Sequence, residues 1–522
     1  MSKSLFRVAV FAVIALSRPI FADTSWISPT DGLWSDPLNW SGGLPQQMQG
    51  ITTIDNSGTK VILLNASADP TNRVIQRLNL SNGSGEATNT LLIDGVALEM
   101  RNTLTMDLGG VLVIRNDGAL NIAGSGTTSL NINGGILDLL GGSLSALTST
   151  TRVGRVTSGF MKILGGTANL ADVLVGDFPQ STGGLLVDGG VLNVSSNLVV
   201  ADDVGSTGAV VVVNGELNMS NSNAVLRVGD DNVGQLLVYG GTVRADVDDF
   251  AVGRRTNSSG FFQVAGGTVI TTDISIGRFQ GATGVVVVVG GQLLATNDSL
   301  RIGREGFGQF YISNGVARVS DAVISMNASG NGVLRVEGGE LHVTSNLVAN
   351  GIALLTQGTL SVGHFYLTNN AGLMIFPGGT MRSGGTTVSN GSPFVVGDGL
   401  KPATYHMTGG VHEFADGLII SENATLSGCG TIIGNVINNG GTISTNCGSA
   451  TPPTMMNPQF SSGTFSFSFQ SEPGVTYNIE YQTTLSEGPW QPLETRTGDG
   501  SVLMVTDPAA SGVSRFYRIR VP

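Results

Sequence analysis

A phrase of about two dozen residues recurs along most of the chain and limits what the chain can fold into. In each copy an apolar stretch leads into a Gly-Gly or Asn-Gly turn, and a second apolar stretch follows, as in LLVDGGVLNV and LLVYGGTVRA. The turn glycines lie 23 to 26 residues apart, at Gly95, Gly118, Gly142, Gly166, Gly190, Gly215, Gly241, Gly267, Gly291, Gly315 and Gly339, with weaker copies at Gly358, Gly379 and Gly410. A constant period in this range predicts a stacked repeat architecture.

A second phrase lies between these turns: a β-branched residue, a glycine, a polar loop and another glycine, as in VGDDNVG and IGREGFG. Each period therefore holds about three short strands and three turns. Glycine makes up 76 of 522 residues, and hydrophobic residues make up 41%, which favours many buried strands over helices or disorder. We predict an all-β chain: a right-handed β-solenoid (β-helix) of about 24 residues per coil, with roughly 14 coils stacked over about 65 Å.

The start of the predicted solenoid, residues 23–50, is rich in tryptophan. Trp26, Trp34 and Trp40 lie in or near the segment GLWSDPLNWSGGLP. A stacked repeat needs a cap over its first coil, and a cluster of large apolar rings can form one. We therefore predict an N-terminal cap here, with sugar stacking on the exposed rings as the alternative. The repeats then occupy residues 51–450.

The two cysteines of the chain, Cys429 and Cys447, lie near the end of the repeats, in GCGTIIGNVINNGGTISTNCG. Equivalent positions on adjacent coils are separated by a distance compatible with a disulfide. In an oxidising compartment such a pair favours a disulfide over a metal site or a nucleophile. We predict that Cys429 and Cys447 form a disulfide that joins the last coils.

The character of the chain changes after residue 450. Three segments alternate between apolar and polar residues, at 464–470, 476–482 and 515–521, and turn signals separate them. This pattern predicts a small antiparallel β-sandwich over residues 451–522. Trp490 is the expected core aromatic of this module.

The first 22 residues have the features of a signal peptide: a basic head, a nine-residue apolar stretch and a small-residue cleavage site. That stretch is too short to span a bilayer, and no later run is long enough, so no transmembrane segment is expected. We predict a protein that is secreted or loosely attached to the cell surface. The formal net charge of −12 argues against nucleic acid as a partner, since polyphosphate would be repelled.

The paired phrases VGDDNVGQLLVYGGTV and IGREGFGQFYISNGVARV resemble the repeats of bacterial autotransporter-type passenger domains and related secreted solenoids. The segment GLWSDPLNWSGGLP resembles the one that often introduces such repeats, and LSGCGTIIGNVINNGGTIS is similar to the motif that often ends them. The C-terminal RFYRIRV resembles the end of small β-sandwich modules that close multidomain bacterial secreted proteins. The resemblance covers residues 23–450 and implies an adhesin, a surface protein or another exported solenoid.

Charged residues follow the glycine of the second phrase at a constant position. If the coils stack in register, they form a column of three acids and then three arginines: Asp177, Asp202, Asp230, Arg254, Arg278 and Arg304. A solvated turn tolerates such like charges, which is one interpretation. The functional interpretation is that Asp202, Asp203, Asp230 and Asp231 hold Ca²⁺ through oxygen ligands. Arg254, Arg278 and Arg304 would then bind carboxylate or sulfate groups of a polysaccharide.

The regular period also bears on catalysis. Secreted right-handed β-helices include polysaccharide lyases, but the period barely varies across residues 95–339, which leaves little chain for a catalytic cleft. His406 and His412 lie near the longest break and are expected to be exposed turn residues. We predict a monomeric structural or adhesive protein, not an enzyme, without a cofactor other than possible Ca²⁺. Its partner would be an extracellular glycan or a cell-surface molecule; the alternative is a lyase or another carbohydrate-active enzyme.

Overall fold

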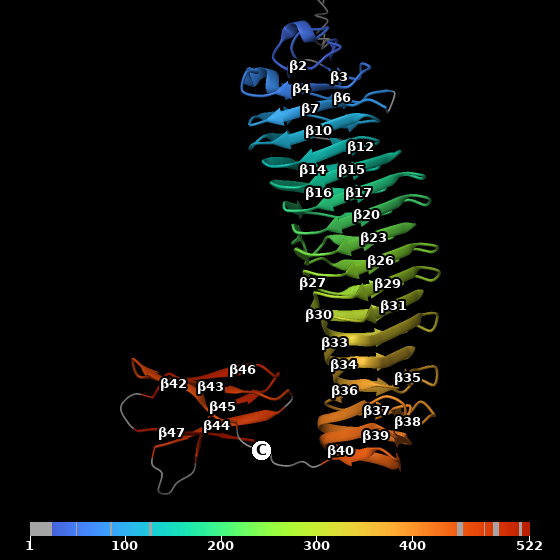
Figure 1. Cartoon of the computed structure of the whole chain (residues 1–522), viewed down its shortest axis with the longest axis vertical. Coiled ribbons are helices and arrows are strands. Elements are labelled where there is room, and N and C mark those ends of the chain that lie inside the picture. The colour runs from blue at the N-terminus through green and yellow to red at the C-terminus, as the bar shows by residue number, and fades with distance from the viewer. Residues whose placement is uncertain are drawn as a thin grey trace, which may run out of the picture.

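The computed structural model describes residues 23–47, 50–83, 86–124, 128–445, 453–473, 475–483, 490–510 and 514–521, without the side chains of residues 296–297. It shows a parallel β-solenoid of about 17 turns and a small C-terminal module of two antiparallel sheets (Figure 1). Within the described residues, no helix is long and apolar enough to cross a membrane. The predicted signal peptide lies outside the described residues.

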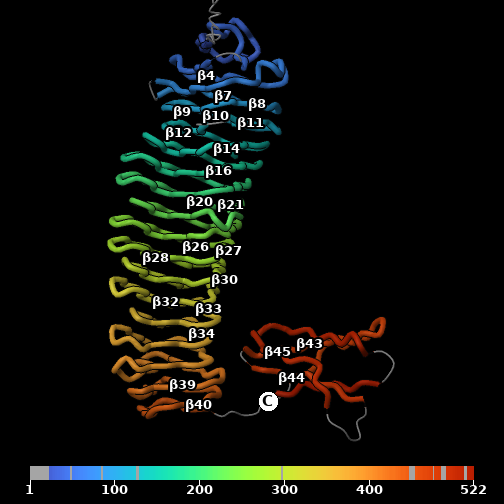
Figure 2. The backbone as a smooth tube through the Cα atoms, turned by 180° about the vertical axis from the view of Figure 1, so that it is seen from behind, coloured from blue at the N-terminus to red at the C-terminus, as the bar shows by residue number. Residues whose placement is uncertain are grey.

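Three parallel ladders form the three faces of the solenoid, and the chain passes from face C to face A and then to face B in each coil. Figure 2 shows the solenoid from behind, with its coils stacked one above another from β4 to β40. Face A contains β2 (Gly32–Leu33), β4 (Lys60–Leu64), β7 (Asn89–Asp94), β10 (Gly110–Arg115), β13 (Ile136–Leu139), β15 (Ser158–Ile163), β17 (Thr182–Val187), β20 (Thr207–Val212), β23 (Val233–Val238), β26 (Ser259–Val264), β29 (Thr283–Val288), β31 (Phe307–Ile312), β35 (Leu373–Ile375) and β38 (Phe394–Val396).

Faces B and C are built in the same way. Face B contains β5 (Val74–Ile75), β8 (Ala97–Met100), β11 (Ala119–Ile122), β18 (Val191–Val194), β21 (Glu216–Met219), β24 (Thr242–Ala245), β27 (Thr268–Thr271), β36 (Gly379–Ser383) and β41 (Thr442–Ser444). Face C contains β1 (Thr24–Ser25), β3 (Thr52–Ile54), β6 (Leu78–Leu80), β9 (Leu104–Met106), β12 (Ser129–Ile132), β19 (Leu198–Val200), β22 (Val225–Val228), β25 (Asp249–Val252), β28 (Ile274–Ile276) and β37 (Thr386–Val388).

Eight longer strands continue through one or two corners. β14 (Ser143–Val153), β16 (Thr167–Val175), β30 (Gln292–Ile302) and β32 (Val316–Ile324) join faces B and C. β33 (Asn331–Ala349), β34 (Ile352–Leu367), β39 (Ala403–Ser421) and β40 (Ala424–Asn439) each contribute to all three faces. Without turn residues at the corners a coil is shorter, so Val333 pairs with Ile352 only 19 positions later. This accounts for the reduced spacing of the turn glycines after residue 339.

The predicted 14 coils are too few. The additional turns lie before residue 89 and after residue 421, where the chain lacks the Gly-Gly phrase that marks the other coils. At the 4.8 Å spacing of paired strands, 17 coils extend over about 80 Å. The phrase therefore identified the regular middle of the solenoid, while backbone pairing extends it in both directions.

Alternating strand residues build a continuous core. In β20 the pattern of buried and half-buried positions alternates strictly, and Val210 and Val212 point inward. In-register pairing places Val212 on Val238 of the next coil, which in turn lies on Val264. Each coil thus buries its apolar side chains on similar side chains of its neighbours, so stability is shared between adjacent coils.

Glycines at the corner between faces A and B are required by close backbone approach. Gly142 has φ +77°, and a Cβ atom there would lie 2.0 Å from the carbonyl oxygen of Gly118 in the coil before. Gly166 repeats this relation to Gly142, with 2.3 Å. Most glycines of the column share this left-handed conformation, which other residues cannot adopt without strain. Gly118, Gly190 and Gly215 do not, and there close approach alone excludes a side chain.

The tryptophan cluster seals the N-terminal end. Trp26, Trp34 and Trp40 are 1%, 0% and 3% exposed, and the centroid of the Trp40 ring lies 5.2 and 5.0 Å from those of the other two. The indole of Trp34 donates to the carbonyl of Asn72 over 2.9 Å. Two short 3-10 helices, η1 (Pro37–Asn39) and η2 (Pro70–Arg73), belong to this end of the chain. Rings without exposed faces cannot stack on sugar, so the cluster is a cap.

A buried lysine holds the first coils together. Lys60 in β4 is 1% exposed, and its ammonium donates to the carbonyls of Asn56, Ser57 and Gly58 and to Oδ1 of Asn89 over 2.7–2.9 Å. Four acceptors satisfy the charge that burial would otherwise make costly. Lys60 thus connects its own turn to the next coil.

The C-terminal module is a sandwich of two three-stranded antiparallel sheets. One contains β42 (Met456–Ser461), β43 (Thr464–Gln470) and β46 (Val502–Asp507); the other contains β45 (Gln491–Thr497), β44 (Thr476–Gln482) and β47 (Phe516–Arg520). Its core combines side chains of both sheets: Phe467, Phe469, Tyr477, Ile479, Val505 and Ile519. β43 and β44 have the predicted bounds.

The expected core role of Trp490 is wrong. Trp490 lies just before β45, is half-buried, and packs under the guanidinium of Arg518, whose Cζ is 4.3 Å from the ring centroid. Phenylalanine side chains on alternate positions of β43 fill the space between the sheets instead. A residue ahead of an edge strand does not reach that space.

Candidate functional site

The turns between faces C and A stack into a charged column, which we call the charged edge: Arg155, Asp177, Asp202, Asp203, Asp230, Asp231, Arg254, Arg255, Arg278 and Arg304. Backbone hydrogen bonds hold the column in register. The amide of Asp177 donates to Gly154 over 3.1 Å, and that of Arg254 donates to Gly229 over 3.0 Å. The three acids and three arginines therefore stack in the predicted order.

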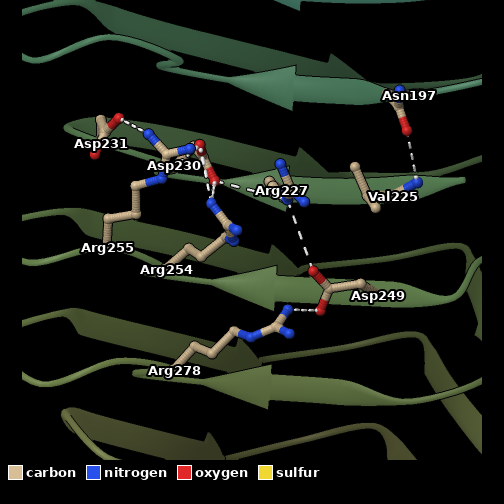
Figure 3. Close-up of polar contacts among 9 residues, drawn as sticks. All are labelled: Asn197, Val225, Arg227, Asp230, Asp231, Asp249, Arg254, Arg255 and Arg278. Carbon is tan, nitrogen blue, oxygen red and sulfur yellow. Dashed lines mark hydrogen bonds and ion pairs between the residues drawn. The ribbon is translucent and has the colours of Figure 1, made fainter.

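The acids at the centre of the charged edge are paired with arginines rather than solvated. Asp230 is 0% exposed, and its carboxylate lies 3.1 Å from Arg254, 3.6 Å from Arg255 and 3.7 Å from Arg227 (Figure 3). Asp231 also contacts Arg255. Because the arginines come from three positions on two coils, the carboxylate of Asp230 ties these coils together by charge.

The arginine half of the charged edge continues this network. Arg278 forms an ion pair with Asp249 of β25, which Arg227 also approaches to 3.7 Å (Figure 3). The Phe279 ring lies between two guanidinium groups, 5.7 Å from Arg254 and 5.3 Å from Arg278. Such stacking orients the guanidinium planes.

Among the three arginines predicted to bind a ligand, the structure therefore distinguishes two classes. Arg254 and Arg278 each have a carboxylate partner. Arg304 forms no ion pair within the described part of the chain, and its Nε lacks a hydrogen-bond partner. Of these three arginines, only Arg304 has no carboxylate partner among the described residues.

The four predicted Ca²⁺ ligands lie near enough to interact by charge, but they are not arranged as a metal site. Asp230 and Asp231 are engaged by arginines, whose positive charge opposes a cation. Over the residues that the structure describes, no group of three His, Cys, Asp or Glu side chains is placed to hold a metal ion, and this includes Asp202 and Asp203.

Asp202 differs from the other acids. It is half-buried, and burial together with the negative charges of Asp230, Asp177 and Asp203 raises its pKa from 3.8 to about 6. Asp177 has a raised pKa for the same main reason, burial, although Arg152 and Arg155 oppose the shift. Perturbed carboxyl groups of this kind occur at functional sites and also in structural ion-pair networks.

The raised pKa predicts a pH dependence of stability. In the unfolded chain Asp202 ionises near pH 4, whereas in the folded protein it retains its proton to about pH 6. Its contribution to stability is therefore fully present below pH 4 and is lost as the pH rises through 6. Asp202→Asn should leave unfolding by urea unchanged at pH 4 but raise the unfolding free energy by about 1–2 kcal/mol at pH 7.5.

Asp248→Asn is the matched control for this measurement, because Asp248 is an exposed carboxylate on the corner between faces B and C. We expect no difference from the parent protein at either pH. An Asp202→Asn variant that is equally stable at both pH values relative to the parent would contradict the burial of this carboxyl group.

A groove, which we call the face-C groove, crosses the outer surface beside the charged edge. It consists of two adjoining hollows of about 250 and 590 Å³. Their lining residues are Thr128, Ser129, Leu147–Thr150, Arg152, Ala171, Asp172, Leu174, Ser195–Asn197, Val199, Val225 and Arg227.

Strand register explains the order of side chains in the groove. Arg152 pairs with Leu174, Leu174 with Val199, and Val199 with Arg227, so one column reads arginine, two apolar residues, arginine across four coils. The neighbouring column is made rigid by Asn197, whose amide donates to Asp172 over 2.9 Å. The result is an apolar floor with a guanidinium group at each end.

The groove arginines are held by acids of the charged edge. Arg152 Nε lies 2.9 Å from Asp177 Oδ2. Burial lowers the pKa of Arg227, and the charge of Arg254 adds to this effect. Arg227 thus connects the face-C groove to the arginine half of the charged edge.

Our sequence reasoning did not find these two arginines. A signal was present: Arg152, Arg227 and Arg301 each lie two positions before the glycine of the second phrase. Because strand residues alternate, this position points outward on face C. The sequence prediction considered only the residues after the glycine of the second phrase, and not the column of residues two positions before it.

The histidines near residue 410 are not exposed turn residues as expected. His412 is 0% exposed, its Nδ1 lies 2.8 Å from the hydroxyl of Tyr405, and its Nε2 lies 2.8 Å from the carbonyl of Gly409. Burial lowers the pKa of His412, so the ring is neutral inside the solenoid. His406 is half-buried and hydrogen-bonds Ser427. The buried network of His412 satisfies polar groups within the core.

Comparisons of the chain with models of protein families, with curated proteins and with solved structures find no match. The functional interpretation therefore depends on the face-C groove and the charged edge.

Proposed function

We propose that this protein is an exported, elongated scaffold that binds an anionic polysaccharide in the face-C groove without cleaving it. The observation that carries the proposal is the order of side chains across four coils: an arginine at each end and an apolar floor between them. This order fits a chain of sugar units that carries carboxylate or sulfate groups.

Each part of the groove has a role in such binding. Arg152 and Arg227 offer planar, forked donors that match carboxylate or sulfate oxygens. Leu174, which is half-buried, provides an apolar surface for the C–H faces of a sugar ring, and Val199 beside it is 5% exposed. The second hollow is rich in hydroxyl groups, which suits the hydroxyls of a polymer that extends beyond the arginines.

The direction of the ligand follows from the stacking. Arg152 and Arg227 are three coil steps apart, or about 14 Å along the solenoid at 4.8 Å per step. A polymer parallel to the solenoid axis spans both, and continues past Arg254 and Arg278 to Arg304, which has no carboxylate partner among the described residues. A short ligand across the coils would reach only one guanidinium group.

The solenoid itself supports a scaffold role. Each coil rests on the next through in-register ladders over about 17 turns, which makes an extended body with shared stability. The proposed location, secreted or at the cell surface, rests on the predicted signal peptide. A rod of this kind holds a glycan site at a distance from its ends.

Removal of the two groove arginines tests the proposal. Arg152→Ala/Arg227→Ala should weaken binding of polygalacturonate by about 10- to 100-fold, because each lost charge-assisted contact contributes on the order of tenfold. Binding is measured by biolayer interferometry at low salt, with dextran as the neutral polymer. The parent protein should bind polygalacturonate more weakly as salt rises and should not bind dextran.

The control is Arg244→Ala, which removes an exposed arginine from β24 on face B. Its binding should equal that of the parent protein. Equal affinities of the parent and the double variant would overturn the groove proposal. Substitution of Arg254, Arg278 and Arg304 by alanine then tests the charged edge separately: unchanged binding would restrict the site to the groove.

A carbohydrate-active enzyme is the second candidate, and the raised pKa of Asp202 favours it. A carboxyl group with pKa about 6 can act as a proton donor or acceptor near neutral pH. This candidate predicts new reducing ends or absorbing unsaturated products from acidic polysaccharides, and their loss in Asp202→Asn. Absence of both products across a panel of acidic and neutral polysaccharides would remove the candidate.

A further inference from the structure

The two ends of the solenoid are finished differently. The N-terminal end is closed by the buried tryptophan cap. At the other end, core-facing apolar side chains of the last coil stay partly exposed: Ile443 is 43% exposed, and Ile432 and Val436 are only half-buried against the core. We call this surface, formed by residues 431–439 of β40 and by β41, the open end. Cys429 lies beside it in β40, and Cys447 lies outside the described residues, so their disulfide stays a prediction.

The open end carries no charge. Between Glu422 and Glu472 the sequence contains no Asp, Glu, Lys or Arg, although the whole chain has a net charge of −12. Natural proteins protect exposed sheet edges with charged residues, because an unprotected edge pairs with other strands. A neutral, apolar edge on an otherwise acidic protein indicates a surface that a partner covers.

The shape of the open end restricts that partner. Within the described residues, the 431–434 and 436–439 segments of β40 pair with β39, and β41 pairs with β40, so each has a partner on one side only. On all three faces, the outer backbone groups point in the same direction, along the solenoid axis away from the coil before. A partner that pairs with all three must present three edges in the same arrangement, as a second solenoid end does.

We propose that two copies of this chain associate tail to tail through their open ends. A twofold axis perpendicular to the solenoid axis reverses the direction of the strands, so the two last coils meet in antiparallel pairing. Charge does not oppose the contact, because both surfaces are neutral. The tryptophan cap blocks the other end, so growth stops at two copies and no fibre forms.

This inference replaces the expectation of a monomer and is independent of glycan binding. It predicts that the full chain sediments with twice the mass of one chain at 1–100 μM. Its maximum dimension in solution scattering should approach twice the length of one solenoid. A single-chain mass at 100 μM would overturn it.

A lysine introduced at the open end should dissociate the dimer. Ile443→Lys places an ammonium group in the proposed contact, because Ile443 pairs with the buried Leu426 and faces the core, and we expect a dissociation constant raised by about 100-fold or more. Leu400→Lys is the control, because Leu400 is 83% exposed on a turn beside the same end and outside the contact. Its dimer should persist. Circular dichroism shows that both variants are folded.

Two further outcomes test whether a second copy is what covers the open end. A dimer that survives both Val436→Lys and Ile443→Lys would place the interface elsewhere and overturn the proposal. A full chain that stays monomeric, while a chain ending at residue 450 dimerises, would show that the C-terminal module covers the open end in the same molecule, and this would also overturn it.

Discussion

Trp34→Ala will lower the free energy of unfolding of the N-terminal coils by about 3–5 kcal/mol. The ring of Trp34 is fully buried against Trp40, and its indole donates to the carbonyl of Asn72. Alanine leaves a cavity, removes this hydrogen bond and exposes the first coil, and each of these effects destabilises the fold. Urea unfolding followed by circular dichroism measures the change.

The same model predicts where along the solenoid Trp34→Ala destabilises the fold. In a stacked repeat each coil contacts only its neighbours, so hydrogen exchange should quicken first in β3, β4 and β7 and least near β39. Leu38→Ala is the control, since Leu38 belongs to the same cap but is 84% exposed. Similar losses in the two variants, or uniform exchange along the solenoid, would contradict the role of the cluster as a cap.

Gly142→Ala is expected to lower the free energy of unfolding by about 2–5 kcal/mol. An alanine at φ +77° is strained by about 1–2 kcal/mol. Its Cβ would also lie 2.0 Å from the carbonyl oxygen of Gly118, so the backbones of two coils must separate, which adds roughly 1–3 kcal/mol. The loss is measured by denaturant unfolding.

Gly391→Ala separates the strain of the left-handed backbone from the effect of close coil stacking. Gly391 has φ +82°, but a Cβ there meets no atom within 4 Å. This variant should lose only about 1–2 kcal/mol, the strain of the left-handed conformation. If both variants lose the same amount, close stacking of the coils does not explain the glycine column.

The regular middle of the solenoid was predictable because one coil repeats the constraints of the next. Turn glycines such as Gly142 are demanded by a left-handed backbone, and alternating valines such as Val212 by the inward direction of every second residue. β43 and β44 were predictable for the same reason, since alternation in a short strand is a local property.

Other features depended on partners far apart in the sequence. Lys60 looks like an ordinary surface residue until its turn and Asn89 of the next coil surround its ammonium. Asp230 was predicted as a metal ligand, but the following coil supplies Arg254 and Arg255 to its carboxylate. His412 was expected on the surface, yet corner-spanning β39 turns it inward to Tyr405.

The sequence alone determined the period, the all-β class, the stacking order of the charged edge and the cap, because each follows from residue direction along a strand and from backbone conformation at a turn. Only the tertiary structure decided which charges neutralise each other, where face C is hollowed and which end of the solenoid stays open. Those properties depend on distances between side chains of different coils, and a one-dimensional pattern specifies which coils are neighbours but not how their side chains meet.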